Sequence, residues 1–181
     1  DRSRGLGDVY KRQLLWRIIL DDRTFYFYTI AFILCLLLLS LIVPLYRKHK
    51  INDQIKGLAN NTLEMTPKQF MQMRKQSLGG RGKPSYALKK NFAGVYILYN
   101  KTKNKYYVGQ AKQILNRVNA HFTGKGNGDV YADYKYGDEF TIKMIALENS
   151  GYKTLNELER NTISVYNAFS KGYNKTRGNK G

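Results

Sequence analysis

Arg117 and His121, in the C-terminal half of the chain, have the types and the spacing to act on a phosphate ester. They are four positions apart, so on a helix both side chains leave the backbone on one side. The fork of an arginine fits phosphate oxygens in pairs, and a guanidinium and an imidazole aimed together suit a phosphodiester. We interpret the pair in this way, although a lone histidine such as His121 is more often a half-buried helical residue.

Glu159 lies on the apolar side of a second expected helix. Leu155, Glu159, Ile163 and Tyr166 are spaced four, four and three residues apart and share one face. An unpaired carboxylate on such a face is costly, and a bound cation would compensate that cost. Glu157 lies on a polar side, so we choose Glu159 as the metal ligand. A structural salt bridge is the alternative for this residue.

Tyr96 and Tyr107 lie at matched ends of the stretch GVYILYNKTKNKYYVGQ, residues 94–110. A phenol has a pKa near 10, so ionising it at pH 7 costs about 4 kcal/mol without help. A metal ion and cationic surroundings would reduce that cost, and residues 81–181 carry 18 Lys and Arg against 7 Asp and Glu, a net charge of +11. Taken singly, either tyrosine is better interpreted as a structural strand residue.

The elements that must position these side chains form a small α/β (α+β) domain over residues 91–181. Two short runs rich in β-branched and aromatic residues flank NKTKN and predict a hairpin. Helical spacing, a third strand with Phe140, Ile142 and Met144 on one face, and a second helix follow. The expected order is β-β-α-β-α with a three-stranded sheet: strands 94–99 and 105–109, helix 113–122, strand 139–147 and helix 155–169.

The hairpin resembles the GIY-YIG nuclease family, with GVY (94–96) and YVG (107–109) as the two name-giving motifs. The tyrosines are eleven residues apart, which suits that family. Further elements of the family follow in the expected order: Arg117, His121, Glu159, and Asn174 within GYNKT. Six elements in order, in a matching β-β-α-β-α frame, are a specific signal.

The resemblance implies an endonuclease in which Tyr96 acts on the attacking water and Tyr107 helps to hold the phosphate. Gly94 and Gly109 fit positions where the backbone must approach closely, and Asn174 would fix the terminal loop against the site. Mg²⁺ or another divalent cation would sit on Glu159, because Mg²⁺ keeps several waters and takes oxygens from the substrate phosphate. The implied reaction is hydrolysis of a DNA phosphodiester by metal-aided water.

A stretch of 23 residues without charge, Thr24 to Tyr46, precedes this domain. As a helix it would span about 34 Å, against a hydrocarbon core of about 30 Å, and aromatic residues gather at its ends. We therefore expect a transmembrane helix over residues 24–46. Basic residues follow it (Arg47, Lys48, Lys50 and Lys56), so the positive-inside rule places the C-terminal domain in the cytoplasm.

The remaining segments receive simpler interpretations. Residues 1–13, DRSRGLGDVYKRQ, look like a non-native translated scar or a disordered tail. Residues 47–90 are expected to form a basic tether, with a short helix after Thr66-Pro67 and a stop at Gly79-Gly80. The tyrosines of VYADYKYGDEF, residues 130–140, either stack on bases or pack in the core.

Composition bounds the possible partners. A formal net charge of +18 suggests nucleic acid or an anionic membrane surface, and the single cysteine, Cys35, excludes an intrachain disulfide. The leading prediction is a single-pass, membrane-anchored, metal-dependent nuclease that cuts DNA near the cytoplasmic face, with foreign DNA as a target. Its membrane contacts would be residues 24–46 and the flanking basic residues. The alternatives are a nucleic-acid-binding protein that no longer cleaves and a basic protein that faces lipid headgroups.

Overall fold

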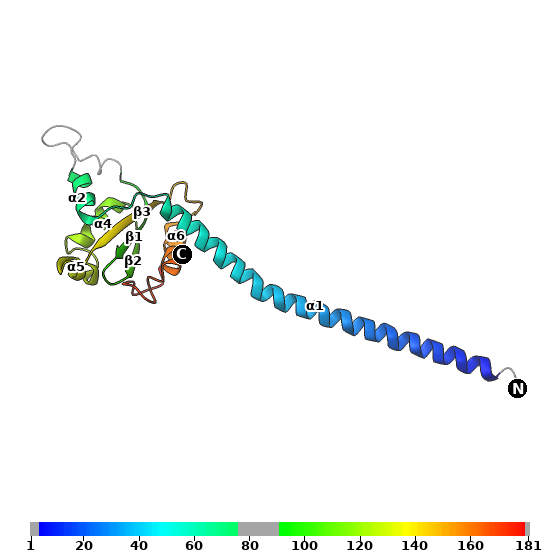
Figure 1. Cartoon of the computed structure of the whole chain (residues 1–181). Coiled ribbons are helices and arrows are strands. Elements are labelled where there is room, and N and C mark those ends of the chain that lie inside the picture. Colours follow the sequence, from blue (N-terminus) through cyan, green and yellow to red (C-terminus); the bar gives the residue numbers. More distant parts are fainter. Residues whose placement is uncertain (1–3, 76–90, 180–181) are drawn as a thin grey trace. The chain divides into compact units, whose positions relative to one another are not determined.

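The computed structural model describes residues 4–75 and 91–179 (Figure 1). The chain divides into two compact units, Asp1–His49 and Lys50–Gly181. The first unit is helical, and the second contains a sheet covered by helices. The helix α1, Arg4–Asn60, begins in the first unit and ends in the second.

Helix α1 includes the whole uncharged stretch. Its apolar side chains between residues 25 and 46 are largely exposed, as Leu41 is at 65%. Among the described residues, this is the one helix that is long and apolar enough to cross a membrane by length and composition. The helix begins at Arg4, so residues 4–13 are helical and do not form the disordered tail that was one of the two expectations. Extending an existing helix adds one hydrogen bond per residue and needs no new nucleus. A non-native origin for residues 1–13 stays a prediction.

The sheet has three antiparallel strands, β1 (Gly94–Asn100), β2 (Lys105–Ala111) and β3 (Phe140–Ala146), in the order β2-β1-β3. This confirms the expected hairpin and third strand. The hairpin turn ends at Asn104, which adopts a positive φ of 52°. At the other edge, Met65 exchanges two backbone hydrogen bonds with Ile142 of β3, at 3.1 and 2.8 Å.

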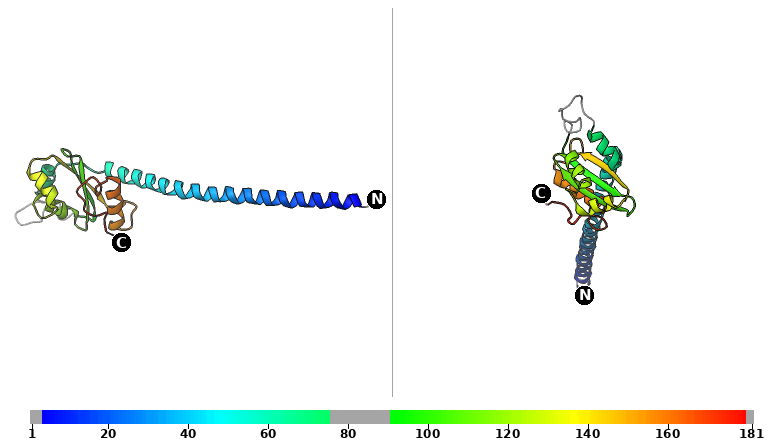
Figure 2. Two further views of the ribbon diagram at one scale, coloured as in Figure 1. Left: turned by 90° about the horizontal axis from the view of Figure 1, so that it is seen from below. Right: turned by 90° about the vertical axis from the view of Figure 1, so that its left-hand side faces the viewer.

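Alternate residues of β1 serve two cores on the two faces of the sheet. Tyr96 and Leu98 face a core that is covered by α2 (Pro67–Lys75), α4 (Ile114–Phe122) and α5 (Gly128–Lys135). Val95 and Ile97 face a second core, which is built with α6 (Leu155–Val165) and the end of α1. Figures 1 and 2 show α6 (orange) and the α4–α5 pair on opposite sides of the strands.

Residues 50–75 differ from the expected flexible tether. Ile55, Ala59 and Phe70 are each 0% exposed and belong to the two cores. Burial of each large apolar side chain stabilises a fold by about 1.5–3 kcal/mol, which accounts for the docking of this segment. The short helix after Thr66-Pro67 is confirmed as α2, whereas the stop at Gly79-Gly80 lies outside the described residues.

Helix α6 ends at Val165, four residues before the predicted end. Asn167 has a φ of 51°, and the Ala168 and Asn167 amides donate to the carbonyls of Ile163 (3.0 Å) and Ser164 (3.3 Å). This is a Schellman motif, in which an αL residue terminates a helix. Asparagine is the residue besides glycine that adopts αL most readily, and it stops the helix here.

Helix α5 is an additional element between the first predicted helix and β3. The Asn127 side chain accepts a hydrogen bond from the Val130 amide at 3.0 Å and caps its first turn. Val130 is fully buried, and the Tyr134 ring packs edge-on against Phe122, with centroids 4.9 Å apart. For Tyr134, this decides between the two interpretations of residues 130–140 in favour of core packing.

Candidate active site

Tyr96 and His121 form a buried pair between β1 and α4. Tyr96 is 1% exposed and His121 is 0% exposed, and the Tyr96 hydroxyl lies 2.8 Å from His121 Nε2. The Asn127 backbone amide donates to His121 Nδ1 at 2.9 Å. Because Nδ1 accepts this bond, a neutral imidazole carries its proton on Nε2 and donates it to Tyr96 Oη.

The electrostatic surroundings favour the neutral forms of both groups. Burial, together with the Arg117 charge, lowers the pKa of His121 to about 4, so the imidazole is uncharged at pH 7. Burial also raises the pKa of Tyr96, and the neighbouring Tyr107 adds to that rise, whereas the charge and hydrogen bonding of Arg117 lower it. His121 therefore hydrogen bonds to the Tyr96 hydroxyl. This differs from the sequence interpretation, in which His121 and Arg117 point together toward the substrate.

Tyr107 and Arg117 complete the cluster on this face of the sheet. The Tyr107 ring centroid lies 4.9 Å from that of His121 and 6.2 Å from that of Tyr96. Burial raises the pKa of Tyr107, and the charge of Arg117 opposes that rise. Arg117 is exposed, so its guanidinium remains accessible to a substrate while it influences both phenols. Four of the five predicted catalytic side chains thus come together.

Glu159 belongs to α6, which lies on the other face of the sheet, and approaches the cluster at the β2 edge. It is 9% exposed, and burial raises its pKa. Its negative charge raises the pKa of Tyr107. This electrostatic influence links Glu159 to the tyrosine cluster.

Amide groups satisfy the Glu159 carboxylate. Gln110 Nε2 donates to Glu159 Oε2 at 2.9 Å, and the backbones of Gln110 and Asn179 hydrogen bond to the same carboxylate and lower its pKa. The assumption of an unpaired acid was therefore wrong, because the edge of β2 and the C-terminal segment supply donors. Gln110 follows directly after the YVG motif and lies opposite Val95, so its position on the α6 face follows from strand alternation.

The two motif glycines have clear steric reasons. Gly109 pairs with Tyr96 across the hairpin, and a Cβ at Gly109 would overlap the Tyr96 hydroxyl. A Cβ at Gly94 would overlap the Ile145 carbonyl of β3. Both positions agree with the expected close approach. Gly126 is a third such glycine, which sequence reasoning missed, since a Cβ there would overlap the His121 ring.

Asn174 attaches the C-terminal loop to β2. Its Oδ1 accepts from the Val108 amide at 2.9 Å, and its Nδ2 donates to the Val108 carbonyl at 2.7 Å. The side chain thus satisfies both backbone groups of a residue inside the YVG motif. This geometry agrees with a supporting role beside the site.

The oxygen chemistry of Glu159 fits a Mg²⁺ ion held by a single protein carboxylate. Within residues 4–75 and 91–179 there is no group of three or more His, Cys, Asp or Glu side chains that could hold a metal. Mg²⁺ tolerates a sparse protein site, since it retains waters and binds substrate phosphate oxygens. Metal binding here would therefore depend strongly on the substrate.

Comparison with known proteins identifies the domain that contains this cluster. Residues 92–174, less than half of the chain, match the family model of the GIY-YIG catalytic domain. The match covers both tyrosine motifs, Arg117, His121, Glu159 and Asn174. Neither the curated proteins nor the solved structures contain a match to this chain. The family consists of endonucleases, so the match supports phosphodiester hydrolysis at the level of the family.

Proposed function

We propose, from the match to the GIY-YIG catalytic domain, that residues 91–181 form a metal-dependent endonuclease that hydrolyses DNA phosphodiester bonds. The observation that carries this proposal is the convergence of Tyr96, Tyr107, Arg117 and His121 on one face of the sheet. The net charge of +18 supports a polyanionic substrate.

Tyr96 acts on the attacking water in this proposal. Its oxygen accepts a hydrogen bond from His121 Nε2 and lies near the Arg117 charge, and both interactions stabilise a phenolate. Burial disfavours that phenolate, so Tyr96 depends on these two partners to take a proton from water. Arg117 also stabilises the charge that develops on the phosphate, and Tyr107 donates a hydrogen bond to the same group.

Glu159 would hold the divalent cation, with Gln110 orienting its carboxylate. When bound, Mg²⁺ supplies Lewis-acid polarisation of the phosphate and lowers the pKa of nearby water. Gln110 Nε2 holds Glu159 Oε2, and the carboxylate would offer an oxygen to the ion.

Membrane anchoring by residues 24–46 completes the proposal. The exposed apolar surface of α1 and the basic residues after Tyr46 support a single-pass protein with its nuclease domain in the cytoplasm. A nuclease held at the cytoplasmic face would meet DNA that enters the cell, so foreign DNA is the proposed target.

Cleavage of plasmid DNA by the full chain in detergent micelles tests the enzymatic proposal. We expect nicking that requires Mg²⁺ and falls by about 10²–10³-fold in Arg117→Ala and in Glu159→Gln. Glu157→Gln, two positions away on the exposed side of α6, is the matched control and should cleave like the native chain. Salt-sensitive DNA binding without cleavage under any divalent metal would instead favour a binding protein, and equal cleavage by Glu159→Gln would refute the metal assignment.

A further inference from the structure

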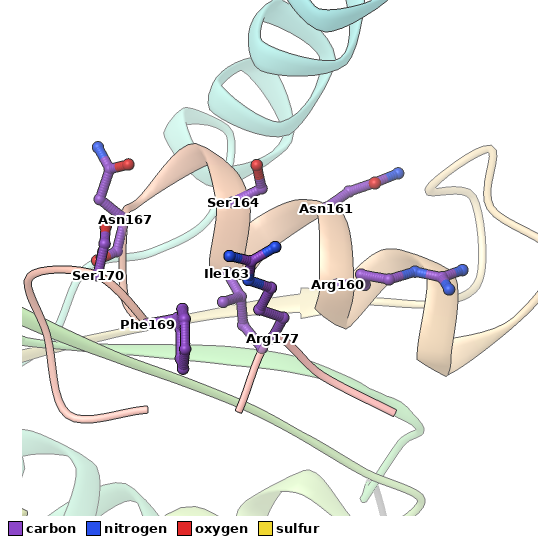
Figure 3. A pocket seen from close by; sticks show the side chains of 8 residues that line it. All are labelled: Arg160, Asn161, Ile163, Ser164, Asn167, Phe169, Ser170 and Arg177. Carbon is purple, nitrogen blue, oxygen red and sulfur yellow. The ribbon is translucent and has the colours of Figure 1, made fainter. Parts of the chain in front are cut away.

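A cavity lies beside α6, and its lining includes no residue of the tyrosine cluster. It has a volume of about 430 Å³, within the range of about 300–1,000 Å³ that is usual for ligand sites. Figure 3 shows it between α6 and the C-terminal segment. Its lining consists of Arg160, Asn161, Ile163, Ser164, Asn167, Phe169, Ser170 and Arg177.

The chemistry of this lining suits a phosphate ester that carries a flat ring. Arg160 and Arg177 contribute two exposed guanidinium groups, and the described lining contains no carboxylate to neutralise them. Phe169 is 41% exposed, and the Arg177 guanidinium lies 5.4 Å from the centre of its ring. A guanidinium binds phosphate oxygens through two parallel N–H donors, and an exposed aromatic ring stacks on a nucleobase.

The cavity is linked to the candidate active site by one short segment. Arg160 follows Glu159 directly on α6, so one of two adjacent residues belongs to the candidate active site and the other lines the cavity. The segment that contributes Arg177 continues past Gly178, which lies against Arg160, to Asn179, whose backbone hydrogen bonds to Glu159. A nucleic-acid strand whose phosphate lies at Glu159 would thus reach the cavity within a short distance.

We propose that this cavity binds a nucleotide unit of the DNA strand beside the scissile phosphate, an inference that rests on the proposed nuclease function. Arg160 and Arg177 each bind a phosphate of the backbone, and Phe169 stacks on a base of the same strand. Stacking accepts every base, so the cavity adds affinity and strand positioning without sequence preference. Serine and asparagine side chains on the rim provide further hydrogen bonds to the sugar and phosphate.

DNA binding by the full chain in neutral-lipid nanodiscs, with EDTA present to prevent cleavage, tests this inference. The double variant Arg160→Ala/Arg177→Ala should lose about 10-fold or more in affinity at low salt. Its plot of log Kd against log salt should be shallower by about 1.8, because each phosphate contact contributes about 0.9. The matched control Lys68→Ala/Lys135→Ala removes two exposed positive charges from α2 and α5 on the other face of the sheet.

The aromatic contribution is measured separately with Phe169. We expect Phe169→Leu to weaken binding of single-stranded DNA by about 5- to 150-fold, since stacking contributes about 1–3 kcal/mol per base, and Phe169→Tyr to restore it. Unchanged circular dichroism would show that these exposed substitutions leave the fold intact. Equal losses in Phe169→Leu and Phe169→Tyr would contradict stacking.

The outcomes separate this inference from the nuclease proposal. If the native chain neither binds nor cuts DNA, the nuclease proposal fails. If the native chain binds and cuts DNA but the arginine variant matches the lysine control, the cavity does not hold the strand. If the arginine variant loses affinity for DNA in anionic nanodiscs but not in neutral ones, the cavity binds lipid headgroups and the inference is overturned.

Discussion

At the scale of single residues, the hydrogen bond between His121 and Tyr96 organises the site. His121 accepts from the Asn127 backbone and donates to Tyr96 Oη, so both ring nitrogens have defined partners. The spacing of Arg117 and His121 correctly placed both on α4. It could not reveal that His121 is buried, since helix rotation against the sheet depends on the packing of Val118 and Phe122.

The pH dependence of stability should report this buried imidazole. Its pKa is about 4 in the folded chain, against an ordinary value near 6.5, so the unfolded chain binds the extra proton between these values. The contribution of His121 to stability is therefore complete above pH 6.5 and decreases by about 3 kcal/mol as the pH falls to 4. Urea unfolding at pH 7, 5.5 and 4.5 measures it, and His121→Gln should show a flatter profile over this window.

Gly109 offers a steric test of the Tyr96 position. Gly109→Ala should destabilise the domain by about 1–3 kcal/mol and reduce cleavage, because the new methyl group overlaps the phenol. Gly128→Ala is the control, since a Cβ there meets nothing within 4 Å at the start of α5. Thermal unfolding of the two variants compares them directly, and equal melting temperatures would contradict the packing of Tyr96 on Gly109.

At the scale of elements, a polar network joins the hairpin, α5 and the C-terminal loop. Lys103 Nζ lies 2.6 Å from Asp133 Oδ1, and the Tyr173 hydroxyl donates to Asp133 Oδ2 at 2.6 Å. The fully buried Asn100 amide donates to Asp138 and to Tyr173, each at 2.7 Å. Asp133 thus connects three segments that are distant in sequence.

Removing the Asp133 charge should loosen this junction. Burial acts to raise the pKa of Asp133, but hydrogen bonds from Lys103 and Tyr173 outweigh it and lower the pKa below its ordinary value. Its contribution is therefore present above the unfolded pKa and lost as the pH falls through the folded value. We expect Asp133→Asn to cost about 1–3 kcal/mol in urea unfolding at pH 7. Asp129→Asn, whose partner Lys175 is 80% exposed, should cost much less.

Local patterns predicted most elements of this domain, and long-range packing accounts for the rest. The β-branched and aromatic runs around NKTKN predicted β1 and β2, alternation in residues 139–147 predicted β3, and Thr66-Pro67 predicted α2. Helix α5 was missed because the tyrosines of residues 130–140 were interpreted only as base-stacking or core residues. Gln110 and the Asn179 backbone at Glu159 could not be predicted, since they depend on how the C-terminal segment folds back.

At the scale of the whole molecule, the proposed membrane anchor and the sheet domain are distinct units. Leu37 and Leu38 lie near the middle of the uncharged stretch and are exposed in α1. Arginine at the centre of a membrane helix costs about 2.5–3.5 kcal/mol. Leu37→Arg/Leu38→Arg should therefore move much of the protein to the soluble fraction after alkaline carbonate extraction. Leu63→Arg, at an exposed residue of the second unit, should stay with the membrane.

Both outer edges of the sheet are covered by groups of the same chain. On β2, the Asn174 side chain hydrogen bonds to both backbone groups of Val108, and the Tyr173 amide donates to the Tyr106 carbonyl at 2.9 Å. On β3, the Met65 backbone pairs with that of Ile142. Unprotected edges recruit strands from neighbouring molecules. Anchored copies would diffuse in two dimensions at high local density, where such recruitment would be fastest. The covered edges would keep crowded copies from polymerising through their sheets, so each would remain a separate unit.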